Sequence, residues 1–303
     1  MQLTSQLLMI RPVDFGFNAE TAVNNTFQSS EGNETAQLNA LTEFNNFVAL
    51  LRKNKLSVTV IDDTPLPHTP DSIFPNNWIS FDEDDSIILY PMFAENRRAE
   101  RKQHILDIIK NDFWVHDEID LTFFEKDDLF LEGTGSMVLD RGNRIAYASL
   151  SPRTNKIVLD EFCNLKNYTA VTFTSVDLNT IEIYHTNVMM CVADKFVVIC
   201  LDAIKNEMEK ANVAASIQQS GKEIIELTQQ QINSFAGNML QVVNTEKERL
   251  LIMSTQAYNS LTPLQIEKLE KYNRILHSPL NTIEKAGGGS ARCMLAEVFL
   301  SPK

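Results

Sequence analysis

The sequence predicts an α/β protein built from five similar strand–strand–helix–strand units. Amphipathic helical patterns recur along the chain at intervals of roughly 50–60 residues. Short β-like runs lie between these helices, usually as a pair before each helix and as a single run after it. Five units of about 60 residues account for the length of 303 residues, which favours an internal repeat over two unrelated domains. We therefore expect a single domain over residues 1–303.

Each expected helix has apolar residues near positions i, i+3 and i+4, which form one buried face. The helical patterns fall at about residues 36–52, 97–111, 154–165, 203–214 and 262–273. The expected strand pairs are short apolar runs at residues 78–81 with 86–90, 136–140 with 144–150, 188–193 with 196–201, and 239–243 with 250–254. A last strand is expected over residues 294–300.

Composition argues against several classes of partner. The net charge of −13 repels the phosphates of nucleic acids and anionic lipid surfaces, so neither is an expected partner. No run reaches the roughly 18 apolar residues of a membrane span, and the first residues lack the pattern of a signal peptide, so we expect a cytoplasmic protein. The four cysteines show no CxxC spacing, which favours reduced thiols over a zinc site or a disulfide framework. We expect no metal and no cofactor.

A glycine-rich segment near the end of the chain, residues 287–294, reads Gly-Gly-Gly-Ser-Ala-Arg-Cys-Met. Consecutive glycines allow a close approach of the backbone, and here they lead to Cys293 beside Arg292. A thiol attacks as the thiolate, which a neighbouring cation or backbone N–H groups stabilise, and Arg292 and the turn are candidates for both. The alternative is a connector followed by a buried strand in which Cys293 is a small core residue.

Polar residues gather in four further loops, and each has an ordinary structural explanation as a turn cap, an exposed acid, an edge histidine or a surface charge. These residues are Asp71, Asn76 and Asn77 in segment 70–78, Glu132 before a glycine turn, His185 and Asn187 in the sequence His-Thr-Asn, and Arg97, Arg98 and Arg153 at loop–helix junctions. A cysteine, a histidine and an acid are the components of a thiol-dependent group transfer. Arginine is well shaped to hold a carboxylate with two parallel hydrogen bonds.

Taken together, these motifs resemble the guanidino-group-modifying superfamily, which includes arginine deiminases, dimethylarginine hydrolases and amidinotransferases. The likeness covers most of the chain. It implies that Cys293 is the nucleophile, that His185 is the general acid and base, and that Glu132 orients His185. It also implies a five-fold pseudosymmetric α/β propeller of ββαβ units, the pentein fold, with the site on its central axis.

The same resemblance assigns the residues that hold an amino-acid substrate. The sequence Pro-Asp-Ser-Ile-Phe, residues 70–74, resembles the substrate loop of dimethylarginine hydrolases and makes Asp71 a ligand of the substrate's amino group. Two arginine segments resemble those that grip the substrate carboxylate, which implies Arg97 and Arg153. The sequence leaves open whether Arg97 or its neighbour Arg98 makes that contact.

Departures from the family pattern bear on the substrate. Asn76 and Asn77 stand where arginine-processing relatives have an acidic pair, and Asn187 stands where several have an aspartate. A guanidinium is a permanent cation, and burying it without carboxylates leaves its charge uncompensated. A neutral ureido group, with one acceptor and several donors, suits an amide. The charge pattern therefore favours citrulline over arginine. In agreement, the segment Phe-Pro-Asn-Asn-Trp, residues 74–78, most closely resembles that of citrulline-utilisation hydrolases, which implies hydrolysis of citrulline to ornithine, carbon dioxide and ammonia.

Other functions stay open on the sequence. The same groups could process arginine or a methylarginine, or transfer an amidino group to an amine in place of water. A non-catalytic amino-acid-binding module is the alternative of another class. The sequence also leaves open whether the chain forms a homo-oligomer.

Overall fold

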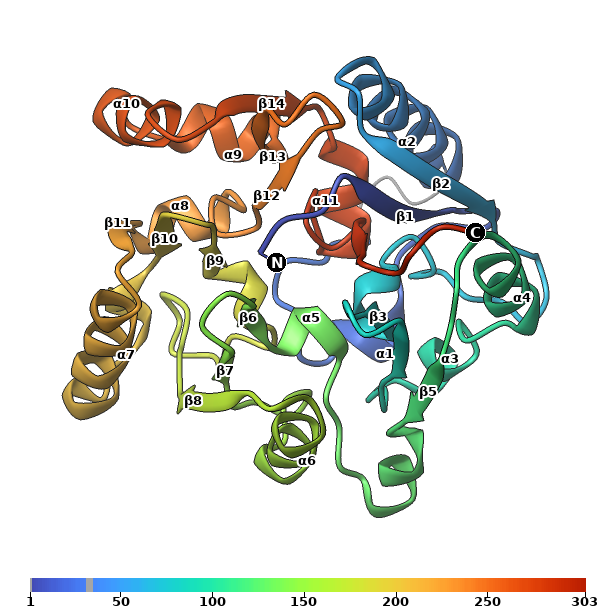
Figure 1. The fold of residues 1–303 in the computed structure, drawn as a ribbon, viewed down its shortest axis with the longest axis horizontal. Helices are drawn as coiled ribbons and strands as arrows, with labels where there is room; N and C mark the ends of the chain where they lie inside the picture. Colours follow the sequence, from blue (N-terminus) through green and yellow to red (C-terminus); the bar gives the residue numbers. More distant parts are fainter. Residues whose placement is uncertain (1, 31–34) are drawn as a thin grey trace.

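Five three-stranded sheets surround a central axis, as Figure 1 shows, and this arrangement confirms the predicted propeller. The computed structural model describes residues 2–30 and 35–303. Within each sheet the inner and middle strands are antiparallel, whereas the middle and outer strands are parallel. A parallel pair needs a crossover connection, and a helix on the outside of the propeller supplies it in each unit.

Each sheet runs from an inner strand near the axis to an outer strand at the rim. In that order the sheets are β15 (Ala296–Val298), β1 (Gln6–Arg11) and β2 (Ser57–Asp62); β3 (Ile79–Phe81), β4 (Ser86–Leu89) and β5 (Asp117–Asp120); β6 (Val138–Asp140), β7 (Ile145–Ser149) and β8 (Thr169–Phe173); β9 (Met190–Val192), β10 (Phe196–Ile199) and β11 (Glu223–Glu226); and β12 (Leu240–Val243), β13 (Arg249–Ser254) and β14 (Arg274–Ser278).

The long crossover helices lie around the rim in Figure 1, and short helices lie nearer the axis or at one end of the strands. The rim helices are α2 (Ala36–Lys53), α4 (Gln103–Asp112), α6 (Lys156–Lys166), α7 (Glu207–Gln219) and α10 (Pro263–Glu270). The short helices are α1 (Ala19–Ala22), α3 (Glu95–Arg98), α5 (Gly133–Ser136), α8 (Gln229–Asn233), α9 (Thr255–Ser260) and α11 (Asn281–Gly287). None of the helices in the described part of the chain is long and apolar enough to cross a membrane.

The fifth unit is assembled from both ends of the chain. Strand β15, near the C-terminus, pairs antiparallel with β1, with Gln6 opposite Val298 and Leu8 opposite Ala296. Strand β1 then pairs parallel with β2 along its whole length. This pairing closes the ring of sheets, so the segment that carries Cys293 is fixed in place by the first strand of the chain.

Two predicted helices are wrong in their bounds. The single helix expected over residues 97–111 is two helices, α3 and α4, because the chain leaves the helical conformation between them. There Glu100 turns inward to bind Arg97, and Lys102, with an extended ψ of 132°, donates to Asp63. The helix expected over residues 203–214 starts at residue 207, since the side chain of Asn206 caps its first backbone N–H groups.

Candidate active site

The five segments that lead into the inner strands meet near the axis, and each brings a polar side chain there. The 3₁₀ turn Pro75–Asn77 precedes β3, and α5, which follows Glu132, precedes β6. The 3₁₀ turn Thr186–Val188 follows His185 and precedes β9. Asn238 lies before β12, and Cys293 lies before β15. Pseudosymmetry therefore gathers residues that are far apart in the sequence.

Two amides surround the sulfur of Cys293. The Nδ2 group of Asn238 lies 3.2 Å from Sγ, and that of Asn187 lies 3.6 Å away. The orientation of Asn238 is fixed because its Oδ1 accepts the backbone N–H of Arg292 at 2.9 Å, which leaves Nδ2 as the donor toward sulfur. N–H donors of this kind stabilise a thiolate.

The side chain of Arg292 does not serve Cys293 as expected. Its guanidinium donates to the carbonyl of Leu295 at 2.7 Å and pairs with Glu297 at 2.9 Å, and it lies outside the cavity that Cys293 lines. Because the carboxylate of Glu297 neutralises this guanidinium, and because the guanidinium does not face the cavity, Arg292 does little to stabilise a thiolate at Cys293. The amides of Asn187 and Asn238 take the place that the sequence suggested for Arg292.

Glu132 and His185 form a buried pair. Glu132 Oε2 lies 2.7 Å from His185 Nε2, and both side chains are nearly inaccessible to solvent. Burial lowers the pKa of the imidazole to about 4, although the carboxylate opposes that shift. The ring is therefore neutral near pH 7. Because an ionised carboxylate only accepts hydrogen bonds, Nε2 carries the proton, and Nδ1 is left with a free lone pair.

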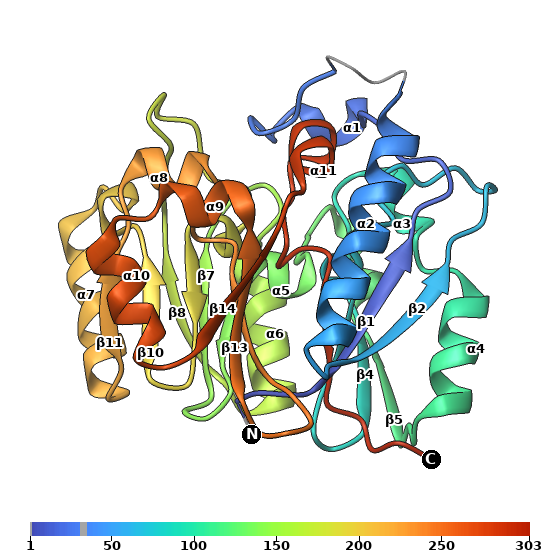
Figure 2. The same ribbon diagram turned by 90° about the horizontal axis from the view of Figure 1, so that it is seen from above.

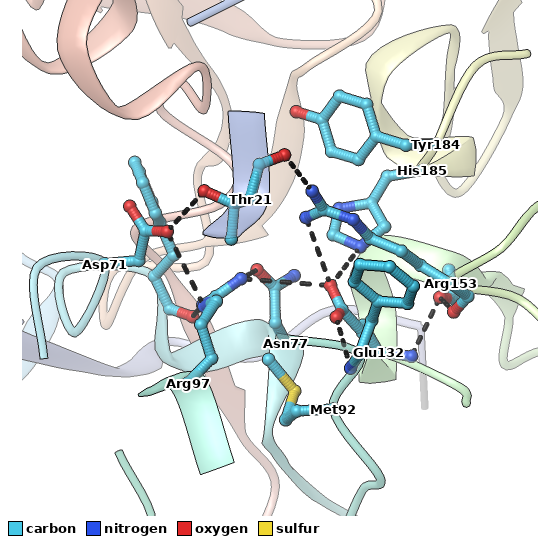
Figure 3. A network of polar contacts seen from close by, with 12 residues as sticks. Thr21, Asp71, Asn77, Met92, Arg97, Glu132, Arg153, Tyr184 and His185 are labelled. Carbon is cyan, nitrogen blue, oxygen red and sulfur yellow. Dashed lines mark hydrogen bonds and ion pairs between the residues drawn. The ribbon is translucent and has the colours of Figure 1, made fainter. Parts of the chain in front are cut away.

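Glu132 is also the centre of a larger polar network, drawn in Figure 3. Its Oε1 accepts the backbone N–H of Phe93 at 3.0 Å, and its Oε2 lies 3.6 Å from Arg153 and 3.9 Å from Arg97. Burial alone would raise the pKa of this carboxyl. Arg153 and the hydrogen bond from His185 outweigh burial and lower the pKa to about 2.

Arg97 is fully buried and most of its donors are already used. It binds Glu100 with two hydrogen bonds, of 2.8 and 3.0 Å, and donates to Asn77 Oδ1 at 2.9 Å and to the carbonyl of Phe74 at 3.3 Å. A guanidinium has five N–H donors, so one is left for another group. Arg97 lines the cavity beside Cys293, whereas Arg98 is partly exposed and donates to backbone carbonyls.

Only one of the two carboxylate oxygens of Asp71 has hydrogen-bond partners among the described residues. Its Oδ2 accepts hydrogen bonds from Asn18 at 2.8 Å and Thr21 at 3.1 Å, and Arg97 Nε lies 4.0 Å away. Its Oδ1 is buried and has no hydrogen-bond partner among the residues that the structure describes. Burial raises the pKa of this carboxyl against the effect of Arg97. A free acceptor with a partial negative charge therefore lines the cavity.

Arg153 contacts a segment that covers the site. Its guanidinium donates to the carbonyl of Thr21 at 2.7 Å and to Oδ1 of Asn24, beside α1. The cavity beneath this segment has a volume of only about 10 Å³, roughly that of a single water molecule. An amino acid can enter only if the covering segment or its side chains move. Arg153 would then exchange its contacts with Thr21 and Asn24 for contacts with a ligand.

Several contributors to the site were not identified from the sequence. Asn238 is one of them. It lies just before an inner strand, as Asn77 does, so an alignment of the repeats would have identified it. Tyr184 is another: its ring packs against His185 with centroids 4.6 Å apart and the ring planes tilted by 47°, and its hydroxyl donates to the carbonyl of Gly288 at 2.7 Å. Gly135 is required because a Cβ there would lie 2.8 Å from His185 Nδ1.

Asn76 differs from the other expected residues in its placement. Its amide donates to Thr134 at 3.3 Å, and it is not among the residues that line the cavity beside Cys293. Asn77 does line that cavity. Its Nδ2 group is buried and has no partner in the described part of the chain.

No group of three or more metal-binding side chains occurs among residues 2–30 and 35–303.

Comparison with known proteins identifies the family of this chain. The chain matches the family described as eukaryotic N,N-dimethylarginine dimethylhydrolase over residues 11–300, and it therefore belongs to that family. The family consists of hydrolases of non-peptide carbon–nitrogen bonds within the guanidino-group-modifying superfamily, as expected from the motifs. No curated protein sequence matches the chain.

Solved structures share the fold at low sequence identity. The apo structure of ArgZ, an arginine dihydrolase of the cyanobacterial ornithine–ammonia cycle, has a TM-score of 0.76 and 19% identity over 98% of this chain. The chain spans 41% of the length of that protein. The N-terminal domain of ArgZ, covalently bound to a reaction intermediate, has a TM-score of 0.73 and 20% identity, with 97% of each chain covered. An adduct of dimethylarginine dimethylaminohydrolase has a TM-score of 0.66 and 14% identity, covering 97% of this chain and 99% of that one.

Iodoacetamide near pH 7 is expected to modify Cys293 before the other three cysteines, because burial raises the pKa of those thiols to about 11 or 12. Asn238→Ala should slow the modification of Cys293 about tenfold or more, since a hydrogen bond to a charged group contributes about 1.5–3 kcal/mol. Mass spectrometry of timed samples measures both rates. The exposed Asn233→Ala variant is the control, and similar rates at all four thiols would contradict the prediction.

The contribution of His185 to folding stability should fall as the pH is lowered from about 6.5 to about 4. Over this range the unfolded chain takes up a proton at His185 that the folded chain binds only near pH 4, so stability present above pH 6.5 is lost. His185→Gln should reduce this loss by on the order of 1–3 kcal/mol. Urea unfolding at pH 4.5 and 7 measures it, with His68→Gln at an exposed position as the control. An equal pH dependence in both variants would refute the assignment.

Proposed function

We propose that the protein is a cysteine-dependent hydrolase that removes ammonia from the ureido group of citrulline and yields ornithine and carbon dioxide. The orientation of the Asn77 side chain is the observation that supports citrulline as the substrate. The arrangement of Cys293, His185 and Glu132 supports the type of reaction.

The amide side chain of Asn77 lines the cavity. Arg97 can only donate hydrogen bonds, so the atom of Asn77 that faces it at 2.9 Å must be the acceptor Oδ1. The Nδ2 group is thereby left without a partner among the described residues. A guanidinium offers only N–H groups and cannot accept this hydrogen bond, whereas a ureido group has a carbonyl oxygen that can. An unmatched buried donor costs about 1–3 kcal/mol, which favours the ureido group.

The first half of the reaction uses Cys293 and His185. The free Nδ1 of His185 takes the thiol proton, and the amides of Asn187 and Asn238 stabilise the thiolate that results. Sulfur attacks the ureido carbon, and the protonated His185 delivers its proton to the terminal nitrogen as the carbon–nitrogen bond breaks. Ammonia leaves, and an S-thiocarbamate remains on Cys293. Glu132 stabilises the imidazolium that forms in between.

The second half consumes one water molecule. His185 Nδ1 takes a proton from water, the hydroxide attacks the thiocarbamate carbon, and the carbon–sulfur bond breaks to restore the thiol with the proton from His185. The carbamate that is released loses carbon dioxide and gives the free amine of ornithine. Citrulline and one water thus give ornithine, carbon dioxide and ammonia, with no change in oxidation state.

Charged side chains bind the α-ammonium and α-carboxylate groups of the substrate. Asp71 Oδ1 is a free, buried acceptor that suits the α-ammonium group. Arg153 suits the α-carboxylate, because its contacts with Thr21 and Asn24 can be exchanged for it when the covering segment moves. Arg97 keeps at most one donor for the carboxylate and mainly fixes Asn77.

Arginine or a methylarginine is the second candidate, and the charge balance of the site favours it. Three buried carboxylates, Asp71, Glu100 and Glu132, face two buried arginines, Arg97 and Arg153, so the network carries an excess of one negative charge when all five groups are ionised. A cationic substrate would balance that charge. The family to which the chain belongs is also described by a methylarginine substrate.

Release of ammonia and ornithine from citrulline, measured beside arginine and dimethylarginine, tests the proposal. We expect turnover of citrulline by the wild-type protein and a loss of at least about 1000-fold in Cys293→Ser, because the weakly nucleophilic hydroxyl replaces the thiolate. Turnover of arginine without turnover of citrulline would keep the nucleophile but overturn the ureido substrate. No turnover of any of the three would overturn the proposed function.

Asn77→Asp should lower kcat/KM for citrulline about 10- to 100-fold relative to arginine, since a carboxylate accepts hydrogen bonds and loses the donor that faces the ureido oxygen. The matched control is Asn76→Asp, which adds the same charge one residue away from the cavity wall. Ratios of kcat/KM for the two substrates give the result. An unchanged ratio in Asn77→Asp, or an equal change in both variants, would remove the argument from the amide.

A further inference from the structure

A second and larger hollow lies beside the candidate active site. Its volume is about 560 Å³, within the range of small-molecule pockets. It opens where α8, α9 and α11 approach the segment at Phe27 and the loop at Asp177. Figure 2 shows α8, α9 and α11 at the same end of the molecule as α1. None of its lining residues belongs to the cavity beside Cys293.

Glu284, on α11, is the distinctive residue of this hollow. It is only 2% exposed, and its Oε1 accepts a hydrogen bond of 2.6 Å from the hydroxyl of Ser290. Its Oε2 is buried and has no hydrogen-bond partner among the residues that the structure describes. Burial raises the pKa of this carboxyl to about 7. A buried carboxylate oxygen without a partner is costly, and a bound cation would compensate it.

The other walls of the hollow also suit a cation on an apolar stem. Phe27 and Phe235 lie side by side with ring centroids 5.2 Å apart, and aromatic faces attract ammonium groups and pack against methylene chains. Asp177 adds a second carboxylate, against the single ammonium of Lys285 at the exposed rim. Amides of Asn233 and Gln256 complete a polar mouth.

We propose that this hollow is a binding site for a primary alkylammonium compound of amino-acid size. Its ammonium group binds Glu284 Oε2, and its carbon chain lies against Phe27 and Phe235. The site is separate from the cavity that Cys293 lines, so it does not depend on which substrate the protein hydrolyses.

An occupant of this site contacts two residues, Glu284 and Phe27, that bind or pack against neighbours of the active site. Glu284 binds Ser290, whose carbonyl accepts the backbone N–H of Cys293 at 3.0 Å. Phe27 packs edge-on against Tyr184, with centroids 6.2 Å apart, and Tyr184 in turn packs at a tilt against His185. The hollow is therefore joined to both the nucleophile and the histidine through direct contacts.

Isothermal titration of the wild-type protein with n-pentylamine tests the site, because this probe has one ammonium group, a chain of suitable length, and neither a carboxylate nor a ureido group for the active site. We expect saturable binding of one molecule per chain, and binding of n-pentanol at least 10-fold weaker. Glu284→Gln, which keeps the acceptor for Ser290, should weaken n-pentylamine binding at least 10-fold.

Glu43→Gln is the matched control, since Glu43 accepts the backbone N–H groups of Thr282 and Ile283 on the same helix but does not line the hollow. It should leave the affinity within about 2-fold of wild type. Asn233→Lys, at an exposed position on the wall, places a like charge near the ammonium and should weaken binding without disturbing the core. The proposal is overturned by the absence of saturable binding, by unchanged affinity in Glu284→Gln, or by an equal loss in Glu43→Gln.

Discussion

The buried carboxylate of Glu132 is the group on which the candidate site depends. It lies in the middle of the network in Figure 3, where His185, the backbone of Phe93 and two arginines surround it. A charge this deep in the protein is tolerated only when partners replace the water that it has lost. The same contacts fix the tautomer of His185 and hold Arg153 beside the carboxylate.

A second chain of contacts sets the character of the cavity wall. Glu100 binds Arg97 with two parallel hydrogen bonds, Arg97 then fixes the amide of Asn77, and Asn77 is left presenting an N–H group. Each step follows from the fixed donor geometry of a guanidinium. Glu100 is fully buried and does not line the cavity, so it acts on the cavity wall only through Arg97.

Much of the architecture could be predicted from the sequence, because the five units repeat the same order of strand-like and helix-like hydrophobic patterns. The apolar face of residues 36–52 became α2 almost to the residue, and the strand pairs fell within two residues of the observed ones. The pairing of β1 with β15 was not predicted, since it joins residues almost 300 positions apart and no local pattern encodes it. Likewise the break between α3 and α4 reflects inward contacts of Glu100 and Lys102, which override a sequence that is helical by its periodicity.

The sequence by itself determined the fold class and the family and supplied the candidates for the reactive side chains, because these depend on residue types in a fixed order and on local periodicity. Only the tertiary structure decided what surrounds them. It placed Asn187 and Asn238 beside Cys293 in place of Arg292, and it lined the cavity with Arg97 and Asn77 but with neither Arg98 nor Asn76. The physical reason is that hydrogen-bond partners and burial are set by segments from all five units at once, and adjacent residues of one segment can face opposite sides.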